Sequence, residues 1–289
     1  MATKLPIWAI GLAVGCMVSG AASAGTVTQF ESTFSGNGVW FDSDVRDGGT
    51  TGIEDLTGKG GNLENNAPLP TGAARLTTGP SNGDKAEVAV TGDFGTVGQF
   101  IESGSLSYDY FKQSLGDLGP SAAASIKLTV LDTNITSTAS TDGFGTFVYE
   151  PTWNLGAPGT SVVVPTDDWL TGLIAGNGGV VWHTGIYGAG NQAGDGSDAN
   201  TLLDWANFFS GDLLDASIIA ISVGVGTFNQ GQTAYFDNVL FSNGKIDLAY
   251  DFELAPVPLP AALPLYGTGL AIVGFLGWRR RRKAALQAA

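Results

Sequence analysis

The amino-acid sequence predicts a mainly β protein, with a β-sandwich or jelly-roll ectodomain and one or two short helices. Glycine supplies 43 of the 289 residues, about twice the usual share, and much of it lies beside Asp, Asn and Ser at turn-like positions. Between these turns, short runs alternate apolar and polar residues, as half-buried strands do. Helical spacing is convincing in one segment only. No fixed-period repeat is present, which argues against a propeller or solenoid.

Two runs carry the alternation most clearly, "SLSYDYFK" at 105–112 and "SIKLTVLD" at 125–132. Every second residue from Leu106 to Tyr110 and from Ile126 to Val130 is aromatic or aliphatic, so one face of each strand is expected to pack on a core. The residues expected to face the core are Leu106, Tyr108, Tyr110, Ile126, Leu128 and Val130.

A β-hairpin is predicted late in the chain. The runs 233–241 and 245–252 flank Ser242-Asn243-Gly244. Asn-Gly accepts the positive φ values of a tight hairpin turn, so the two runs are expected to pair.

The helical segment is "TLLDWANFFSGDLLD" at 201–215, in which large apolar residues recur at spacings of three and four. These residues are Leu202, Leu203, Trp205, Phe208 and Phe209.

Charge is distributed in blocks along the chain. All 27 acidic residues lie between Glu31 and Glu253, whereas six of the 13 basic residues, Lys4 and those at 279–283, lie outside this stretch. The stretch therefore has a net charge of 7 − 27 = −20. A domain this acidic repels nucleic acid and anionic lipid, which excludes nucleic acid as an expected partner.

The N-terminus has the layout of a secretory signal peptide over residues 1–24. Lys4 precedes an uncharged stretch, and Ala22 and Ala24 provide an A-x-A cleavage site. An uncleaved anchor and a lipoprotein acylated at Cys16 are the alternatives. Cleavage after Ala24 removes Cys16, the only cysteine, so the exported chain is expected to lack disulfides.

The C-terminus predicts a membrane segment. Residues 257–278 are uncharged, and three prolines restrict helix to the later part, so we expect a proline-rich linker at 254–264 and a transmembrane segment at 265–278. The basic cluster that follows is expected to stop transfer and to leave a cytoplasmic tail at 279–289. Residues 25–253 then form the exported domain.

This tail resembles the PEP-CTERM sorting domain in its VPLPA form, in which a proline motif, an apolar span and an arginine cluster follow in order. The motif residues are Val257, Pro258, Leu259, Pro260 and Ala261, and the cluster is Arg279, Arg280, Arg281, Arg282 and Lys283. Leu259 stands where the commonest form has Glu. The resemblance implies an exosortase substrate of a Gram-negative bacterium, anchored transiently in the inner membrane and then sorted to the cell surface or to an extracellular, biofilm-associated matrix. A simple anchored ectodomain is the alternative.

No catalytic group stands out in the sequence. His183 is the only histidine, which excludes a histidine-built zinc site. "GPSNG" at 79–83 matches the G-x-S-x-G pattern, but a strand, not a helix, is expected to follow it. We therefore expect a protein that is not an enzyme. The alternative is a secreted glycan-active enzyme that uses an Asp/Glu pair, none of which stands out.

Calcium is the one ion that the sequence favours. The acidic clusters at 42–47 and 195–204 lack EF-hand spacing and are expected to be solvated loops. The segments "QFEST" and "YFDNVLF" resemble the edge strands of jelly-roll carbohydrate-binding and galactose-binding-like modules. This resemblance implies a structural calcium held by Glu31 and Asp237.

Sugar binding normally uses aromatic faces beside polar loops. The segment "VVWHTGIYGAGNQ" offers Trp182, His183 and Tyr187 beside amide side chains, and it is the expected glycan-binding surface. The five exported tryptophans are Trp40, Trp153, Trp169, Trp182 and Trp205, and most are expected to be core residues.

Overall fold

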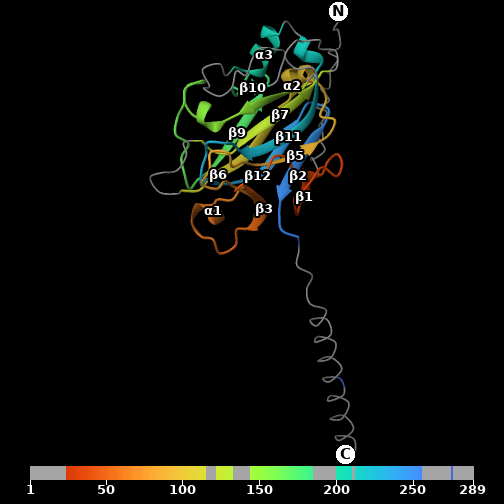
Figure 1. Ribbon diagram of the computed structural model, residues 1–289. Helices are drawn as coiled ribbons and strands as arrows, with labels where there is room; N and C mark the ends of the chain where they lie inside the picture. Colours follow the sequence, from red (N-terminus) through yellow and green to blue (C-terminus); the bar gives the residue numbers. More distant parts are fainter. Residues whose placement is uncertain are drawn as a thin grey trace, which may run out of the picture. The chain divides into compact units, whose positions relative to one another are not determined.

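The computed structural model describes residues 24–114, 122–132, 144–184, 200–209 and 212–255, together with Phe275 (Figure 1). Met1–Leu254 forms one compact unit and Ala255–Ala289 a second. Both hydrophobic core clusters lie inside the first unit, between Trp40 and Phe252. The stretch 25–253 therefore contains the whole described core and can be studied on its own.

Two sheets form the first unit, and we call the seven-stranded one sheet A. Its long central strand β12 pairs on one side with β6, which pairs with β9. On the other side β12 pairs with β4 and β13, which continue to β3 and β1. Only the β1–β13 pair is parallel. The strands are β1 Ala24–Val27, β3 Thr50–Asp55, β4 Gly72–Thr77, β6 Ser105–Lys112, β9 Trp169–Ala175, β12 Thr233–Ser242 and β13 Asp247–Phe252.

The second sheet, sheet B, has six antiparallel strands in the order β10-β8-β7-β11-β5-β2. Its strands are β2 Trp40–Asp42, β5 Ala86–Thr91, β7 Ser125–Leu131, β8 Phe144–Tyr149, β10 Trp182–Thr184 and β11 Ser217–Val225. From β4 to β7 the chain changes sheet at every connection. Two sheets with interleaved strands and few short helices confirm the expected mainly β sandwich.

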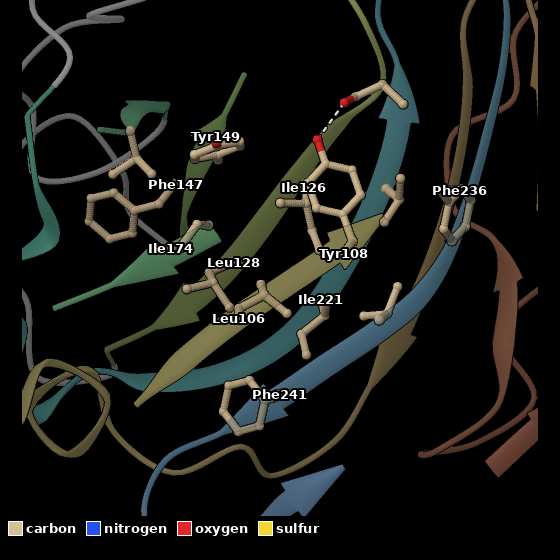
Figure 2. Close-up of a cluster of buried hydrophobic side chains, with 14 of the residues drawn as sticks. Leu106, Tyr108, Ile126, Leu128, Phe147, Tyr149, Ile174, Ile221, Phe236 and Phe241 are labelled. Atoms are coloured by element: carbon tan, nitrogen blue, oxygen red, sulfur yellow. Dashed lines mark hydrogen bonds between the residues drawn. The ribbon is translucent and has the colours of Figure 1, made fainter. Parts of the chain in front are cut away.

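The core fills the space between the sheets. Trp40 of sheet B packs against Phe236 and Phe252 of sheet A, with ring centroids 6.2 and 5.1 Å apart. Figure 2 shows side chains from both sheets meeting in this layer. The buried hydroxyl of Tyr108 donates a hydrogen bond of 2.6 Å to the carbonyl oxygen of Ala124. The side-chain hydroxyl of this tyrosine therefore keeps a hydrogen-bond partner although the ring is buried in the core.

Both alternating runs are strands with the expected inward faces. All six predicted core residues of β6 and β7 are buried. The late hairpin is also confirmed, because β12 pairs with β13 from Ser242 and Asp247 outward. Its loop is longer than a two-residue turn, and the amide of Asn243 donates to the carbonyl of Ile246.

The helical segment forms α3, Leu202–Phe208, and a short 3-10 helix, η2, Asp212–Asp215. Thr201 and Asp204 cap α3 reciprocally. The periodicity did not indicate three further short elements, α1 Gly61–Asn65, α2 Val97–Ser103 and η1 Pro151–Trp153. None of the helices in the described part of the chain is long and apolar enough to cross a bilayer.

Candidate functional site

The outer face of sheet B is hollowed into a cleft of about 850 Å³. Its lining comes from β5, β7, β8 and β10 and from the loop that follows β11. The charged and large aromatic lining residues are Arg46, Lys85, Glu87, Lys127, Glu150, Trp182 and Phe228. This volume falls within the range of small-molecule binding sites.

The register of sheet B explains why these side chains share one face. Trp182 lies opposite Val148, which lies opposite Lys127. Directly opposed residues of neighbouring strands project to the same side of a sheet. The neighbours of Trp182 and Lys127 along each strand, His183 and Leu128, project into the core instead. Strand alternation thus sorts charged and aromatic residues to the cleft.

A chain of ion pairs runs along one side of the cleft. Arg46 binds Asp44 with two nitrogens, at 2.6 and 2.5 Å. Lys85 bridges Asp44 and Glu87 at 2.7 and 2.9 Å. Glu87 then pairs with Lys127. Each of the three cations therefore contacts a carboxylate, and none is left as an unpaired charge for an anionic ligand.

Gly224 makes the Glu87–Lys127 pair possible. Glu87 is on β5 and Lys127 on β7, with β11 between them. Gly224 is the β11 partner of Glu87, and a Cβ on it would lie 2.9 Å from the Cβ and Cγ of Glu87. Without that Cβ, the Glu87 side chain can lie across β11 and reach Lys127.

The two glutamates of the cleft differ in their electrostatic surroundings. Burial alone would raise the pKa of Glu87, but the ammonium groups of Lys127 and Lys85 outweigh it and hold the pKa at about 2. Burial raises the pKa of Glu150, against the opposing hydrogen bond of 2.9 Å that Trp153 Nε1 donates to its carboxylate. Glu87 is thus ionised at neutral pH, whereas Glu150 is the more readily protonated of the two.

Phe228 stands at the rim of the cleft and is 74% exposed. Its backbone has a φ of 65°, a conformation that is costly for a bulky residue and is frequent at functional sites. Its amide donates to Asn82 O at 3.0 Å, and Gly231 N donates to Gly79 O at 2.8 Å. The structure therefore holds a large apolar ring in solvent on a well-anchored loop.

The predicted glycan surface is only partly at this site. Trp182 is half-buried and lines the cleft. His183 is fully buried on the opposite face of β10, where its ring packs edge-on against that of Trp205 at a centroid distance of 4.5 Å. It is therefore a core residue and not part of the expected glycan surface. Tyr187 lies outside the described residues. The sequence pattern does not indicate Phe228 or the ion-pair chain, although the alternation in 125–132 does place Lys127 on the face of the strand away from the core.

Asp237, one of the two predicted calcium ligands, is fully buried. Its Oδ1 accepts a hydrogen bond of 3.1 Å from the amide of Phe252, and Oδ2 has no partner within the described ranges. Burial, with the charges of Asp251 and Glu253 adding to it, raises the pKa of Asp237 to about 7. Asn238, the next residue, has a φ of 50° beside a register shift in β12.

Glu31, the other predicted ligand, pairs through its backbone with β2, and its carboxylate accepts from Gln29 Nε2 at 2.8 Å. The carboxylates that act on Asp237 are those of Asp251 and Glu253, each with one buried oxygen lacking a partner in the described chain. Oxygens of this kind suit a hard cation. No set of three or more His, Cys, Asp or Glu side chains in the described residues is arranged to hold a metal, so a shared Glu31–Asp237 ion stays a prediction.

The acidic side chains of the two clusters, the 79–83 loop and the terminal motifs predicted from the sequence lie outside the cleft lining or outside the described residues. Asp44 belongs to the ion-pair chain, Asp42 accepts from Thr51 at 2.5 Å, and Asp204 caps α3. The loop at 79–83 leads into strand β5, as expected for a turn and not a nucleophile elbow. The signal-cleavage residues Ala22 and Ala24 are at the start of the chain, where only Ala24 is described; the sorting motif at 257–261 and the basic cluster at 279–283 lie outside the described residues.

No family model and no curated protein matches this chain. Among solved structures, it is similar to a family 11 carbohydrate-binding module from Clostridium thermocellum in complex with a β-1,3-1,4-mixed-linked tetrasaccharide, with 11% identity, coverage of 79% of this chain and 97% of that one, and a TM-score of 0.36. It is also similar to a family 30 module of a Clostridium thermocellum cellulosomal cellulase, with 13% identity, coverage of 63% and 82%, and a TM-score of 0.33. Similarity this low carries no argument about function, which rests on the residues of this chain.

Proposed function

We propose that the β-sandwich is a non-catalytic module that binds an uncharged glycan in the cleft of sheet B. The observation that carries the proposal is the pairing of two aromatic walls, Trp182 and Phe228, with a chain of charged groups that are already neutralised by one another. Aromatic faces stack on the apolar faces of sugar rings. Paired carboxylates and ammonium groups can still accept from and donate to hydroxyl groups through charge-assisted hydrogen bonds.

Affinity electrophoresis of 25–253 in gels containing mixed-linkage β-glucan, xylan, mannan, agarose or the anionic polymer alginate tests this proposal. We expect retardation by at least one uncharged polymer, with little change on adding salt, and none by alginate. Trp182→Ala should lose the retardation, because it removes a cleft wall. Leu240→Ala is the control, since Leu240 is exposed on β12 of the other sheet. Retardation that is equal in both variants would contradict the assignment.

A glycan-active enzyme is the second candidate, because Glu87 and Glu150 share the cleft and their pKa values differ in the manner of an acid and a base. Two features argue against it. Glu87 is bound by two ammonium groups. The strands β5 and β8 are also three intervals apart in the sheet, roughly 14 Å at a strand spacing of about 4.8 Å. Release of reducing sugar by the wild type that Glu150→Gln abolishes would favour the enzyme.

We also propose that this module is exported, sorted by an exosortase-type enzyme and delivered to the cell surface or extracellular matrix. The proposal rests on the sequence of the two ends, the cleavage site at Ala22 and Ala24 and the motif at 257–261 followed by basic residues. Mass spectrometry of the surface fraction should find a new C-terminus near 257–261. An intact 279–283 segment in mature surface protein would contradict sorting and leave a simple anchored ectodomain.

Calcium is proposed as a structural ion at Asp237, with Glu31 as the partner that the sequence suggests. The unpartnered buried oxygen of Asp237 supports this proposal. When bound, calcium would neutralise the buried carboxylate and link strand β12 to its neighbours. Thermal unfolding with EDTA or with millimolar calcium tests it, and an unchanged melting temperature would contradict it.

A further inference from the structure

A second aromatic pair lies at the far edge of sheet B, outside the cleft. Phe34 is 57% exposed, and its ring meets that of Phe41 edge-on at a centroid distance of 5.7 Å. The loop that carries Phe34 is tied to β5, because Gly38 N donates to Thr91 O at 2.8 Å and Thr91 Oγ1 donates to Asn37 at 3.0 Å. An exposed ring is therefore held in place beside the sheet.

The register of the sheet places this pair on the same face as the cleft. Phe41 lies opposite Ala89 of β5, and Ala89 lies opposite Ser222 of β11. Ser222 lies opposite Lys127, the residue already connected to Trp182 through β8. Trp40, the neighbour of Phe41, points the other way and is buried in the core. Phe41 and Trp182 thus end one continuous row of side chains across all six strands.

This row is long enough for several sugar rings, and its side chains between Phe41 and Lys127 are small. Six strands define five intervals, so its ends are roughly 24 Å apart at a strand spacing of about 4.8 Å. Ala89 and Ser222, between Phe41 and Lys127, are small and nearly buried, so they form a low floor. A single sugar in the cleft would leave the Phe34–Phe41 pair without a contact, whereas an extended chain lying across the strands would reach it.

We propose that the ligand is an extended oligosaccharide segment that crosses the strands of sheet B, with Phe34 and Phe41 forming a second stacking position beyond the cleft. This inference rests on the proposed function. The occupant is the same uncharged glycan, because the pair continues the face that carries the cleft, and an apolar ring beside polar loops suits a sugar face. The protein then recognises the interior of a polysaccharide and not a chain end or a monosaccharide.

Calorimetric titration of 25–253 with a size series tests the proposal. The series runs from disaccharide to hexasaccharide and is prepared by partial hydrolysis of the polysaccharide that retards the wild type best in the gel panel above. We compare the wild type with Phe34→Ala and with the control Leu240→Ala. Phe34 is largely exposed, so its removal should leave folding intact, which circular dichroism checks.

We expect the affinity of the wild type to rise up to the hexasaccharide. Phe34→Ala should bind the hexasaccharide about tenfold more weakly, as expected for one lost aromatic contact, and the disaccharide equally well. A wild type whose affinity levels off at the trisaccharide, with no effect of Phe34→Ala, would overturn this inference and leave the cleft proposal standing. A wild type that binds none of the polysaccharides would overturn both.

Discussion

Replacing the buried acid Asp237 with Asn should change how the stability of the protein depends on pH. The pKa of Asp237 in the folded protein is about 7, against an ordinary value of 3.8. Between these values the folded state binds a proton that the unfolded state has lost, so stability falls as the pH rises through this window. The difference between the two pKa values corresponds to about 4 kcal/mol at most, reached above pH 7 in the absence of a bound cation.

Asn has the shape of the protonated acid and does not titrate. Its carbonyl can still accept from the amide of Phe252, and its NH₂ group would replace the unpartnered Oδ2 near Asp251 and Glu253. In EDTA at pH 8, we therefore expect Asp237→Asn to be more stable than the wild type by a few kcal/mol, within the bound of about 4 kcal/mol derived from the pKa difference. At pH 4 the two should be nearly equal.

Urea unfolding of 25–253 at a series of pH values measures this difference directly. Millimolar calcium should reverse the order at pH 8, because the ion binds the ionised carboxylate of the wild type and stabilises the folded state by mass action, while the amide binds it poorly. Parallel pH profiles for the two proteins in EDTA would refute the reasoning about burial. A calcium response that is equal in both would refute the ion.

Three further predictions follow from particular contacts. Gly224→Ala should push Glu87 away from Lys127, because the added Cβ would overlap the Glu87 side chain. We expect it to lower the free energy of unfolding in urea by about 1–3 kcal/mol and to weaken retardation in glycan gels. Unchanged glycan retardation would contradict the role given to this glycine. His183→Phe should reduce the loss of stability below pH 6.5. Burial lowers the pKa of the histidine in the folded protein, so only the unfolded chain takes up the proton there. If the free energy of unfolding of both proteins fell equally at acid pH, His183 would not be a neutral core residue. Tyr108→Phe should cost about 1–2 kcal/mol by leaving the carbonyl of Ala124 without its donor, and a neutral effect would mean that water replaces it.

Local pattern was sufficient to predict the sandwich. The alternation of 105–112 and 125–132 identified both strands and their inward faces, since burial of one face leaves a period of two in the sequence. The hairpin between β12 and β13 followed from Asn243-Gly244, which tolerates the turn. The short helices α1 and α2 were missed because one or two turns of helix leave too few residues to establish a period.

The candidate site depended on register, which local pattern does not contain. Glu87 and Lys127 are forty residues apart in the chain and meet only because β5, β11 and β7 are neighbours in the sheet. His183 was grouped with Trp182 because the two are adjacent, yet adjacent residues of a strand face opposite sides. Phe228 carried no sequence signal beyond an aromatic residue in a glycine-containing loop.

A crystal structure of 25–253 with the bound hexasaccharide would show directly whether the cleft of sheet B is the sugar-binding site. We expect sugar rings on the outer face of sheet B, stacked against Trp182 or Phe228, with hydroxyl groups within hydrogen-bond distance of Glu87 and Lys127. Sugar bound instead on the outer face of sheet A, or held only by loops away from the cleft, would contradict it.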